Sequence, residues 1–267
     1  MRVGGHAFRY LTARSRSGRV ISGFRHGLNV LFDDEADPAL IPIQTSATPL
    51  HPFGIEVRRR PIAREGDQVF ADSGCIQVGA GDRVELESAA IDELRVERYA
   101  QADAALVRAR QPLLDQEPAE RGKDPFESRI DGLLAGWRGT ERPVNLADLV
   151  GLGTGSTPSG DDVLVGLLAG WTAVRDVEAR ADRALAARRK ELRSMSLRDR
   201  TSLASAQMIE AALDGSFPEP LRDLCTALPD PRTRVADVEQ LVARVAMLGG
   251  TSGRWMLRGL FSGLCSV

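Results

Sequence analysis

The chain has 267 residues, of which 43% are apolar, and a formal net charge of −2. This length accommodates one large domain or two modest domains with a hydrophobic core. The near-neutral charge, without a basic stripe interleaved with aromatic residues, argues against nucleic acid as a partner. No apolar run reaches the roughly 18 residues of a membrane span.

The cysteine and lysine content limits the kinds of binding site that the chain is expected to contain. Cys75, Cys225 and Cys265 lie far apart and are odd in number. A disulfide framework or a cysteine-ligated zinc site is therefore not expected, and a reducing, cytoplasmic location fits best. No motif predicts a metal or another cofactor. Lys123 and Lys190 are the only lysines, so anion recognition would rely on arginine.

Residues 18–88 have the pattern of short β-strands. Runs rich in Val, Ile, Leu and Phe recur about every ten residues and are separated by turn residues. The expected strands are Val20–Phe24, Leu28–Phe32, Leu40–Ile43, Ile55–Val57, Val69–Ala71, Cys75–Val78 and Val84–Leu86. The pattern predicts a small barrel or sandwich as a β-rich module over residues 1–90.

From Ser88 the pattern becomes helical, which predicts an α+β protein with a mainly helical domain over residues 91–267. The expected helices are Ser88–Leu114, Pro125–Trp137, Ser159 to about Arg193, Thr201–Leu213, Val235–Leu248 and Gly253–Leu264. Asn145 is expected to cap a short segment before the third of these helices. Arg188-Arg189-Lys190 is interpreted as part of a solvated helix face.

The most informative stretch is GLGTGSTPSGDD at residues 151–162. Alternate glycines, hydroxyl residues and a proline precede an apolar helical run, which predicts a glycine-rich loop leading into a helix with Ser159 as its N-cap. Free backbone N–H groups at such a terminus bind anions. The residues expected to bind a small anionic substrate are Gly153, Thr154, Gly155, Ser156, Thr157, Ser159 and Gly160. A tight packed connection is the alternative, and the absence of a Lys after the last glycine excludes a Walker loop.

A second segment repeats this pattern 93 positions later. SGRWMLRGLFSG aligns with SGDDVLVGLLAG, so that Ser252 and Gly253 correspond to Ser159 and Gly160. Both segments carry glycines four residues apart on a helix, which allows two backbones to approach closely. We therefore expect the two helices to pack glycine face to glycine face, with their N-termini converging on one site. Thr251, Ser252 and Gly253 join the expected anion-binding residues.

Three charged residues are the candidates for catalysis. Asp161 and Asp162 lie in a first helical turn, where the dipole favours acids, but two adjacent acids exceed what a cap requires. Because adjacent helical residues diverge by about 100°, only one of the two is expected to face the site. Arg254 occupies the repeat position of Asp161, where a positive side chain opposes the dipole and suits a bound anion. Plain dipole stabilisation and a surface arginine are the alternatives.

A further group of polar residues opens the helix that ends at Leu213. These residues are Arg200, Thr201, Ser202 and Ser205. They are expected to supply an N-cap rather than additional anion donors. The sequence contains no Ser-His-Asp arrangement, no Cys-His pair and no HExxH motif, so nucleophilic and zinc-protease chemistry are not predicted.

The stretch GLGTGSTPSGDDVLVGLLAG resembles the GxGxGLTPSGDDxLxG signature of the AllH family. Downstream, Thr201, Ser205 and Gly215 resemble the family's T…S…A..G helix. GGTSGRWMLRGLFSGL resembles its closing GHTSGxDxLxGLLxGL. The resemblance covers most of residues 20–265 and is strongest over residues 149–170.

The family's namesake is a subunit of a bacterial oxamate carbamoyltransferase. The resemblance therefore implies carbamoyl transfer from carbamoyl phosphate to a small amide or amine acceptor such as oxamate, with other subunits in a homo- or hetero-oligomer. Gly250 stands where the family often has His, and Trp255 where it often has Asp. These departures imply a different acceptor, a different reaction or no activity of the chain's own. A tryptophan in the site would add a flat stacking surface.

Two functions of other classes stay open at this point. A β-rich front followed by a glycine-serine loop is loosely similar to the GHMP kinases, although here the loop comes late in the chain and its TPSGDD tail is foreign to that pattern. A non-catalytic subunit whose glycine loops serve only for packing is the other alternative.

Overall fold

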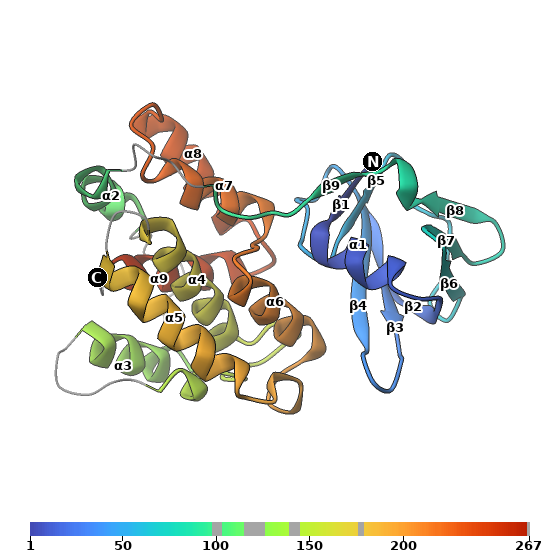
Figure 1. Ribbon diagram of the computed structural model, residues 1–267, viewed down its shortest axis with the longest axis horizontal. Coiled ribbons are helices and arrows are strands. Elements are labelled where there is room, and N and C mark those ends of the chain that lie inside the picture. The colour runs from blue at the N-terminus through green and yellow to red at the C-terminus, as the bar shows by residue number, and fades with distance from the viewer. Residues whose placement is uncertain (98–102, 115–125, 139–144, 176–178, 266–267) are drawn as a thin grey trace. The chain divides into compact units, whose positions relative to one another are not determined.

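The computed structural model describes residues 1–97, 103–114, 126–138, 145–175 and 179–265. The chain divides into two compact units, Met1–Leu94 and Arg95–Val267. The first unit is mainly β-sheet and the second is helical (Figure 1). The α+β class expected from the sequence is therefore confirmed.

Nine described strands of the first unit form one curled sheet in the order β8-β7-β6-β2-β3-β4-β5-β1-β9 (Figure 1). The strands are β1 (Arg2–Gly4), β2 (Arg16–Phe24), β3 (Gly27–Phe32), β4 (Ala39–Thr45), β5 (Ile55–Val57), β6 (Gln68–Asp72), β7 (Cys75–Val78), β8 (Asp82–Glu85) and β9 (Ala90–Asp92). The β4–β5 and β1–β9 pairs are parallel, and the other pairs are antiparallel. All seven predicted strands are present, with ends that differ by a few residues.

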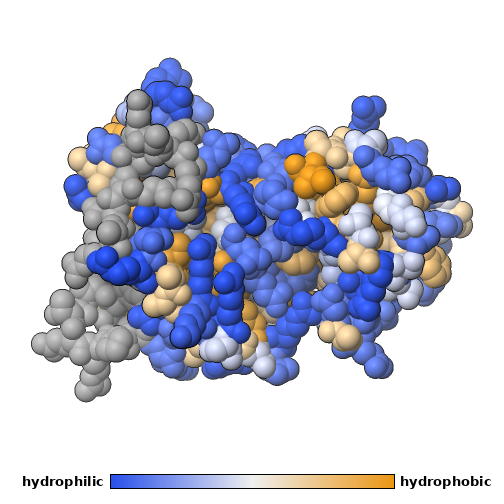
Figure 2. Space-filling view, viewed as in Figure 1, coloured by the Kyte–Doolittle hydropathy of each residue, from blue (hydrophilic) through white to orange (hydrophobic). Residues whose placement is uncertain are grey.

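Alternation of buried and exposed side chains explains why these segments form strands. In β6, Val69 and Ala71 are buried while Phe70 between them is exposed, as the period of two requires. Apolar residues that stay exposed, such as Ile62 and Met247, are scattered, and hydrophilic side chains cover most of the face shown in Figure 2. The apolar residues of the chain therefore lie mainly in the interior.

The prediction of a helix that begins at Ser88 is wrong, because this region first adds another strand to the sheet. Strand β9 occupies Ala90–Asp92, and the first helix of the second unit, α2, spans only Ala104–Arg110. Ile91 and Leu94 have helical spacing. However, β9 pairs with β1, which lies at the other end of the unit in sequence, and Ala90 is opposite Arg2. Local periodicity carries no information on such a long-range pairing, which also explains why β1 was not predicted. Helix α1 (Gly5–Thr12) was not predicted either.

The His51 imidazole is half-buried and lies near α1. The Nδ1 atom of His51 accepts a hydrogen bond from the Phe53 backbone N–H at 3.1 Å. The rings of His6 and His51 both lie against Phe53, with centroid distances of 5.1 and 6.4 Å. The pKa of His51 is lowered to about 4, mainly by burial and to a smaller extent by the charge of His6.

We expect the first unit to lose stability as the pH falls from about 6.5 to about 4. His51 is neutral in the folded state but binds a proton in the unfolded state, so its contribution is present above the unfolded pKa and decreases below it. Between pH 7 and pH 5 the loss is at most about 2 kcal/mol. Calorimetric unfolding at both pH values measures it, and a His51→Gln variant should show a smaller decrease. An equal decrease in the variant would assign the effect to other groups.

The second unit is built around α4 (Ser159–Val174). All residues of α4 are buried, including Trp171. The surrounding helices are α3 (Glu127–Arg138), α5 (Ala179–Arg193), α6 (Leu203–Leu213), α7 (Glu219–Ala227), α8 (Val235–Ala246) and α9 (Ser252–Cys265) (Figure 1). Short 3₁₀ turns occupy Leu86–Ser88, Gln111–Leu114, Leu146–Asp148 and Leu197–Asp199. No helix among the described residues is both long and apolar enough to cross a membrane.

Several helix boundaries differ from those expected. The helix predicted to run to Arg193 is two helices, because α4 ends at Val174 and α5 begins at Ala179. Pro158 takes the N-cap position of α4, so Ser159 is the first helical residue rather than the cap. Helix α7 was not predicted, since Gly215 and Pro218 were interpreted only as the end of the preceding helix, whereas Pro218 is the N-cap of α7 and Pro220 lies in its first turn. Pro125 lies outside the described residues.

Two predicted caps are confirmed. Asn145 Oδ1 accepts the backbone N–H of Ala147 at 3.1 Å, which caps the turn at Leu146–Asp148. Ser202 Oγ accepts the backbone N–H of Ser205 at 3.1 Å and caps α6. Both caps hold the segments that flank the glycine-rich loop.

The packing of α4 on α9 confirms the expected glycine contact. A Cβ atom on Gly166 would lie 2.0 Å from the Met256 carbonyl oxygen, and one on Gly259 would lie 2.0 Å from the Val163 carbonyl oxygen. A turn further on, Cβ atoms on Gly170 and Gly263 would lie 3.2 and 3.3 Å from the Cα atom of the other glycine. We call these four glycines the glycine seam. Their order along both helices shows that α4 and α9 run parallel.

Candidate functional site

The glycine-rich loop before α4 contains three glycines with left-handed backbone conformations. The φ angles of Gly151, Gly153 and Gly155 are +73°, +130° and +91°. A Cβ atom on Gly151 would lie 2.2 Å from the Arg200 carbonyl oxygen, and one on Gly153 would lie 2.5 Å from the Ser159 nitrogen. No atom lies within 4 Å of the Cβ position of Gly155. The first two glycines are thus required for packing, whereas Gly155 faces open space.

Asp161 holds the loop in place. Its Oδ1 atom accepts the Gly151 N–H at 2.8 Å, and its Oδ2 atom accepts the hydroxyl of Thr201. The side chain is 1% exposed. Burial raises the pKa of Asp161, and the hydrogen bonds from Thr201 and Gly151 oppose this change. Thr201 was expected to belong to a cap, so its contact with Asp161 is a role that the sequence did not indicate.

The N-termini of α4 and α9 meet at a pair of hydroxyls. Thr157 Oγ1 and Ser252 Oγ lie 2.9 Å apart, and both residues are half-buried. Because the helices are parallel, the positive ends of two helix dipoles lie side by side. This arrangement favours a negative charge between them.

Asp162 lies behind these hydroxyls and differs from its neighbour. It is 2% exposed, and its Oδ2 atom has no hydrogen-bond partner among the described residues. The pKa of Asp162 is raised to about 8. Burial is the main cause and the charge of Asp161 adds to it, while a hydrogen bond with Ser252 acts in the opposite direction. A carboxyl group with this pKa can carry a proton near neutral pH. The two adjacent acids therefore have distinct environments.

The remaining residues predicted for the site differ in their exposure to solvent. Thr154, Gly155, Ser156, Thr251 and Arg254 are exposed, and Gly153 is half-buried, whereas Ser159, Gly160 and Gly253 are buried. The buried glycines serve packing, since a Cβ on Gly253 would lie 1.8 Å from the Val245 carbonyl oxygen. The Arg254 side chain makes no hydrogen bond or ion pair with the residues that the structure describes. The exposed tip of the loop and Arg254 are thus accessible to a ligand.

Trp255 does not provide the stacking surface that was expected if it entered the site. It is 8% exposed and belongs to the core of the second unit. The Arg258 guanidinium lies 5.4 Å from its ring centroid. Gly250, the other departure from the family pattern, is exposed and has no atom within 4 Å of its Cβ position, so the place where the family often has His is open.

Cavities of the described structure lie away from the loop. One of about 580 Å³ lies along α5, and one of about 480 Å³ lies in the first unit next to β8. Neither is lined by a candidate residue. Within the described ranges, no group of three or more His, Cys, Asp or Glu residues is arranged to hold a metal ion.

These observations define a class: an α+β protein with a β-rich unit and a helical unit that carries a glycine-rich loop at converging helix N-termini. The chain belongs to the AllH family. The family model described as oxamate carbamoyltransferase subunit AllH matches residues 149–264, and that of the AllH family N-terminal domain matches residues 1–92. No curated protein and no solved structure shows significant similarity to the chain.

Proposed function

We propose that the chain is a subunit of a carbamoyltransferase and that it binds carbamoyl phosphate, or a similar small anion, at the N-termini of α4 and α9. The carbamoyl group would pass to a small amide or amine acceptor, with other subunits taking part. The observation that carries this proposal is the contact between Thr157 and Ser252, which brings the two helix ends of the repeat together. The family to which the chain belongs supports the same kind of reaction.

The anion would be held by the exposed tip of the loop. Thr154, Gly155 and Ser156 are exposed, and backbone N–H groups at a helix N-terminus favour phosphate oxygens. Arg254 adds a positive charge without an ion-pair partner among the described residues. Together with the two helix dipoles, these groups would stabilise the charge that develops on the departing phosphate.

Carbamoyl transfer requires a proton to move as the bonds exchange. The acceptor nitrogen attacks the carbamoyl carbon, the bond from that carbon to the phosphate oxygen breaks, and one proton of the nitrogen ends on hydrogen phosphate. We assign this proton transfer to Asp162, because a carboxyl whose pKa is about 8 can give and take a proton near neutral pH. The hydroxyls of Ser252 and Thr157 would connect the buried carboxyl to the half-buried surface. Asp161, engaged by Gly151 and Thr201, would position the loop.

A pair of variants at Gly155 that are matched in shape and differ in charge tests the anion site. Gly155 faces open space with φ +91°, so Asp and Asn side chains meet the same backbone strain and differ only in charge. We expect carbamoyl phosphate at about 100 times its dissociation constant to stabilise the wild-type chain by about 2.7 kcal/mol in a thermal-shift experiment. Gly155→Asp should abolish this response, whereas Gly155→Asn should keep most of it.

Other ligands in the same experiment separate the alternatives. Oxamate tests the acceptor, and ATP with magnesium tests the kinase. Stabilisation by ATP with magnesium alone would contradict the proposal in favour of a kinase. Equal losses of the carbamoyl phosphate response in Gly155→Asp and Gly155→Asn would mean that charge at this position does not matter, and no response in the wild type would favour a subunit without a donor site.

A further inference from the structure

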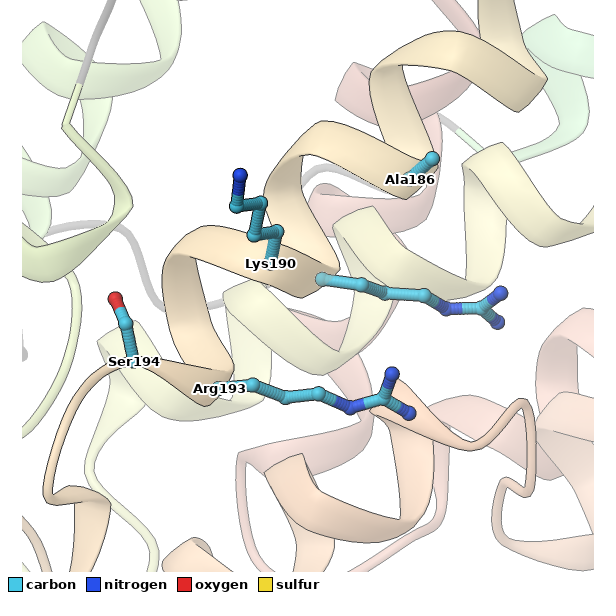
Figure 3. Close-up of a pocket in the computed structure, with 5 residues that line it drawn as sticks. Ala186, Lys190, Arg193 and Ser194 are labelled. Atoms are coloured by element: carbon cyan, nitrogen blue, oxygen red, sulfur yellow. The ribbon is translucent and has the colours of Figure 1, made fainter.

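The cavity of about 580 Å³ along α5 has a cationic lining. Its residues are Ala186, Arg189, Lys190, Arg193 and Ser194 (Figure 3). Their spacing of three and four residues places them on one face of α5 and its C-terminal end. The lining holds three positive side chains and no acid. The volume lies within the range of about 300–1,000 Å³ that is typical of small-ligand sites.

The charge of this lining is only partly neutralised by the protein. Arg193 is paired with Asp214, with a distance of 2.7 Å between Nη2 and Oδ1. Arg188, which does not line the cavity, is paired with Glu191 at 2.7 Å. Lys190 makes no ion pair within the part of the chain that the structure describes. The solvated face that the sequence predicts at Arg188-Arg189-Lys190 therefore contains residues in very different environments.

Arg189 is the residue whose environment requires an explanation. It is half-buried, and its Nε atom is buried without a hydrogen-bond partner. Its guanidinium makes no ion pair with any residue that is described. Burial lowers the pKa of Arg189, and the positive charges of Arg175 and Arg193 lower it further, against smaller opposing effects of Asp214 and Asp182. A buried donor without an acceptor destabilises a protein, so this cluster is suited to an anion that supplies the missing acceptors.

We propose that this cavity is a second anion-binding site, separate from the glycine-rich loop, and that it takes a phosphate group carried by a soluble small molecule. The planar guanidinium of Arg189 would bind two phosphate oxygens, and the Lys190 ammonium on the same helix would add positive charge near the site. The volume exceeds that of a phosphate ion, which leaves room for the organic part of a phosphorylated metabolite. The site stands independently of the proposed carbamoyl phosphate site.

Calorimetric titration with pyrophosphate at constant ionic strength tests this site. The experiment uses the full chain carrying Gly155→Asp, so that binding at the glycine-rich loop does not contribute. We expect Arg189→Gln in this background to weaken pyrophosphate binding by about tenfold or more, as befits the loss of a charge-assisted hydrogen bond. Arg183→Gln removes the same charge from an exposed position of α5 and should change the affinity less than about twofold.

A second measurement distinguishes a binding role from a structural one. Without pyrophosphate, Arg189→Gln should raise the melting temperature, because it removes a partly buried charge whose repulsion from Arg175 and Arg193 exceeds its attraction to Asp214 and Asp182. A structural arginine would give the opposite sign, and a lower melting temperature of this variant would overturn the proposal. Equal effects of Arg189→Gln and Arg183→Gln on pyrophosphate binding, or no binding in the Gly155→Asp background, would overturn it as well. If Arg189→Gln does not fold, Lys190→Gln takes its place in the titration and should also weaken binding.

Discussion

Alanine at Gly166 or Gly259 is expected to destabilise the helical unit by at least about 3 kcal/mol. The added methyl group would lie 2.0 Å from a backbone carbonyl oxygen of the opposite helix, and backbone cannot rotate away as a side chain can. The usual cost of overpacking, about 1–3 kcal/mol, is therefore a lower limit. Urea unfolding followed by tryptophan fluorescence measures the effect, since Trp171 and Trp255 are buried in this unit.

Gly132 provides the matched control. It lies inside α3, and nothing lies within 4 Å of its Cβ position. Gly132→Ala should therefore stabilise the chain by about 0.5–1 kcal/mol, because alanine has the higher helix propensity. A Gly166→Ala variant within about 1 kcal/mol of the wild type would show that α4 and α9 can move apart, and it would remove the reason given for the glycine seam.

Asp162→Asn is expected to lower the turnover of the assembled carbamoyltransferase by about 100-fold or more, the usual contribution of a proton-transferring group. The same change should stabilise the chain at pH 8 by at least about 1 kcal/mol. The folded-state pKa of Asp162 is about 8, above its ordinary value of 3.8, so its protonated form stabilises the fold below pH 3.8 and this contribution is lost as the pH rises through 8. Asparagine does not titrate and avoids the loss.

Asp161→Asn is the control for this pair of effects. It makes the same chemical change one residue earlier, but the asparagine would offer an amide group in place of one of the two acceptors that Gly151 and Thr201 use. The disrupted hydrogen bond should cost about 1–3 kcal/mol, and because burial raises the pKa of Asp161 as well, part of this loss is offset at high pH. Full turnover of Asp162→Asn would remove the proton-transfer role, and lower stability of Asp162→Asn at pH 8 would contradict the raised pKa.

Sequence patterns identified the parts of this fold that depend on local spacing. Apolar runs recurring about every ten residues between turn residues located the seven strands β2 to β8, and apolar spacing located α4, α6 and α8. The offset of 93 positions between the two glycine segments predicted the parallel contact of α4 with α9. The pairing of β9 with β1 was missed, because two strands of three residues each acquire stability only from partners elsewhere in the sheet.

The candidate site shows the same division between local and long-range information. The glycine-rich loop and its two acids are evident from the sequence. The different roles of the two acids are not evident from it. Asp161 and Asp162 differ because Thr201 contacts one and Ser252 the other, and these partners lie before α6 and at the start of α9. Arg189 was grouped with its two basic neighbours, since sequence does not reveal that Asp214 forms its ion pair with Arg193 rather than with Arg189.

The glycine seam also has a consequence for the folding pathway. Helical proteins commonly fold fast because their contacts join residues that are near in sequence. Here the central contact joins segments 93 positions apart, so closing that large chain loop must precede the docking of α9 onto α4. The transition state of this unit would therefore include a contact of high sequence separation. Because Thr157 and Ser252 belong to the two segments, the ability to bind an anion would arise in the same kinetic step as the seam.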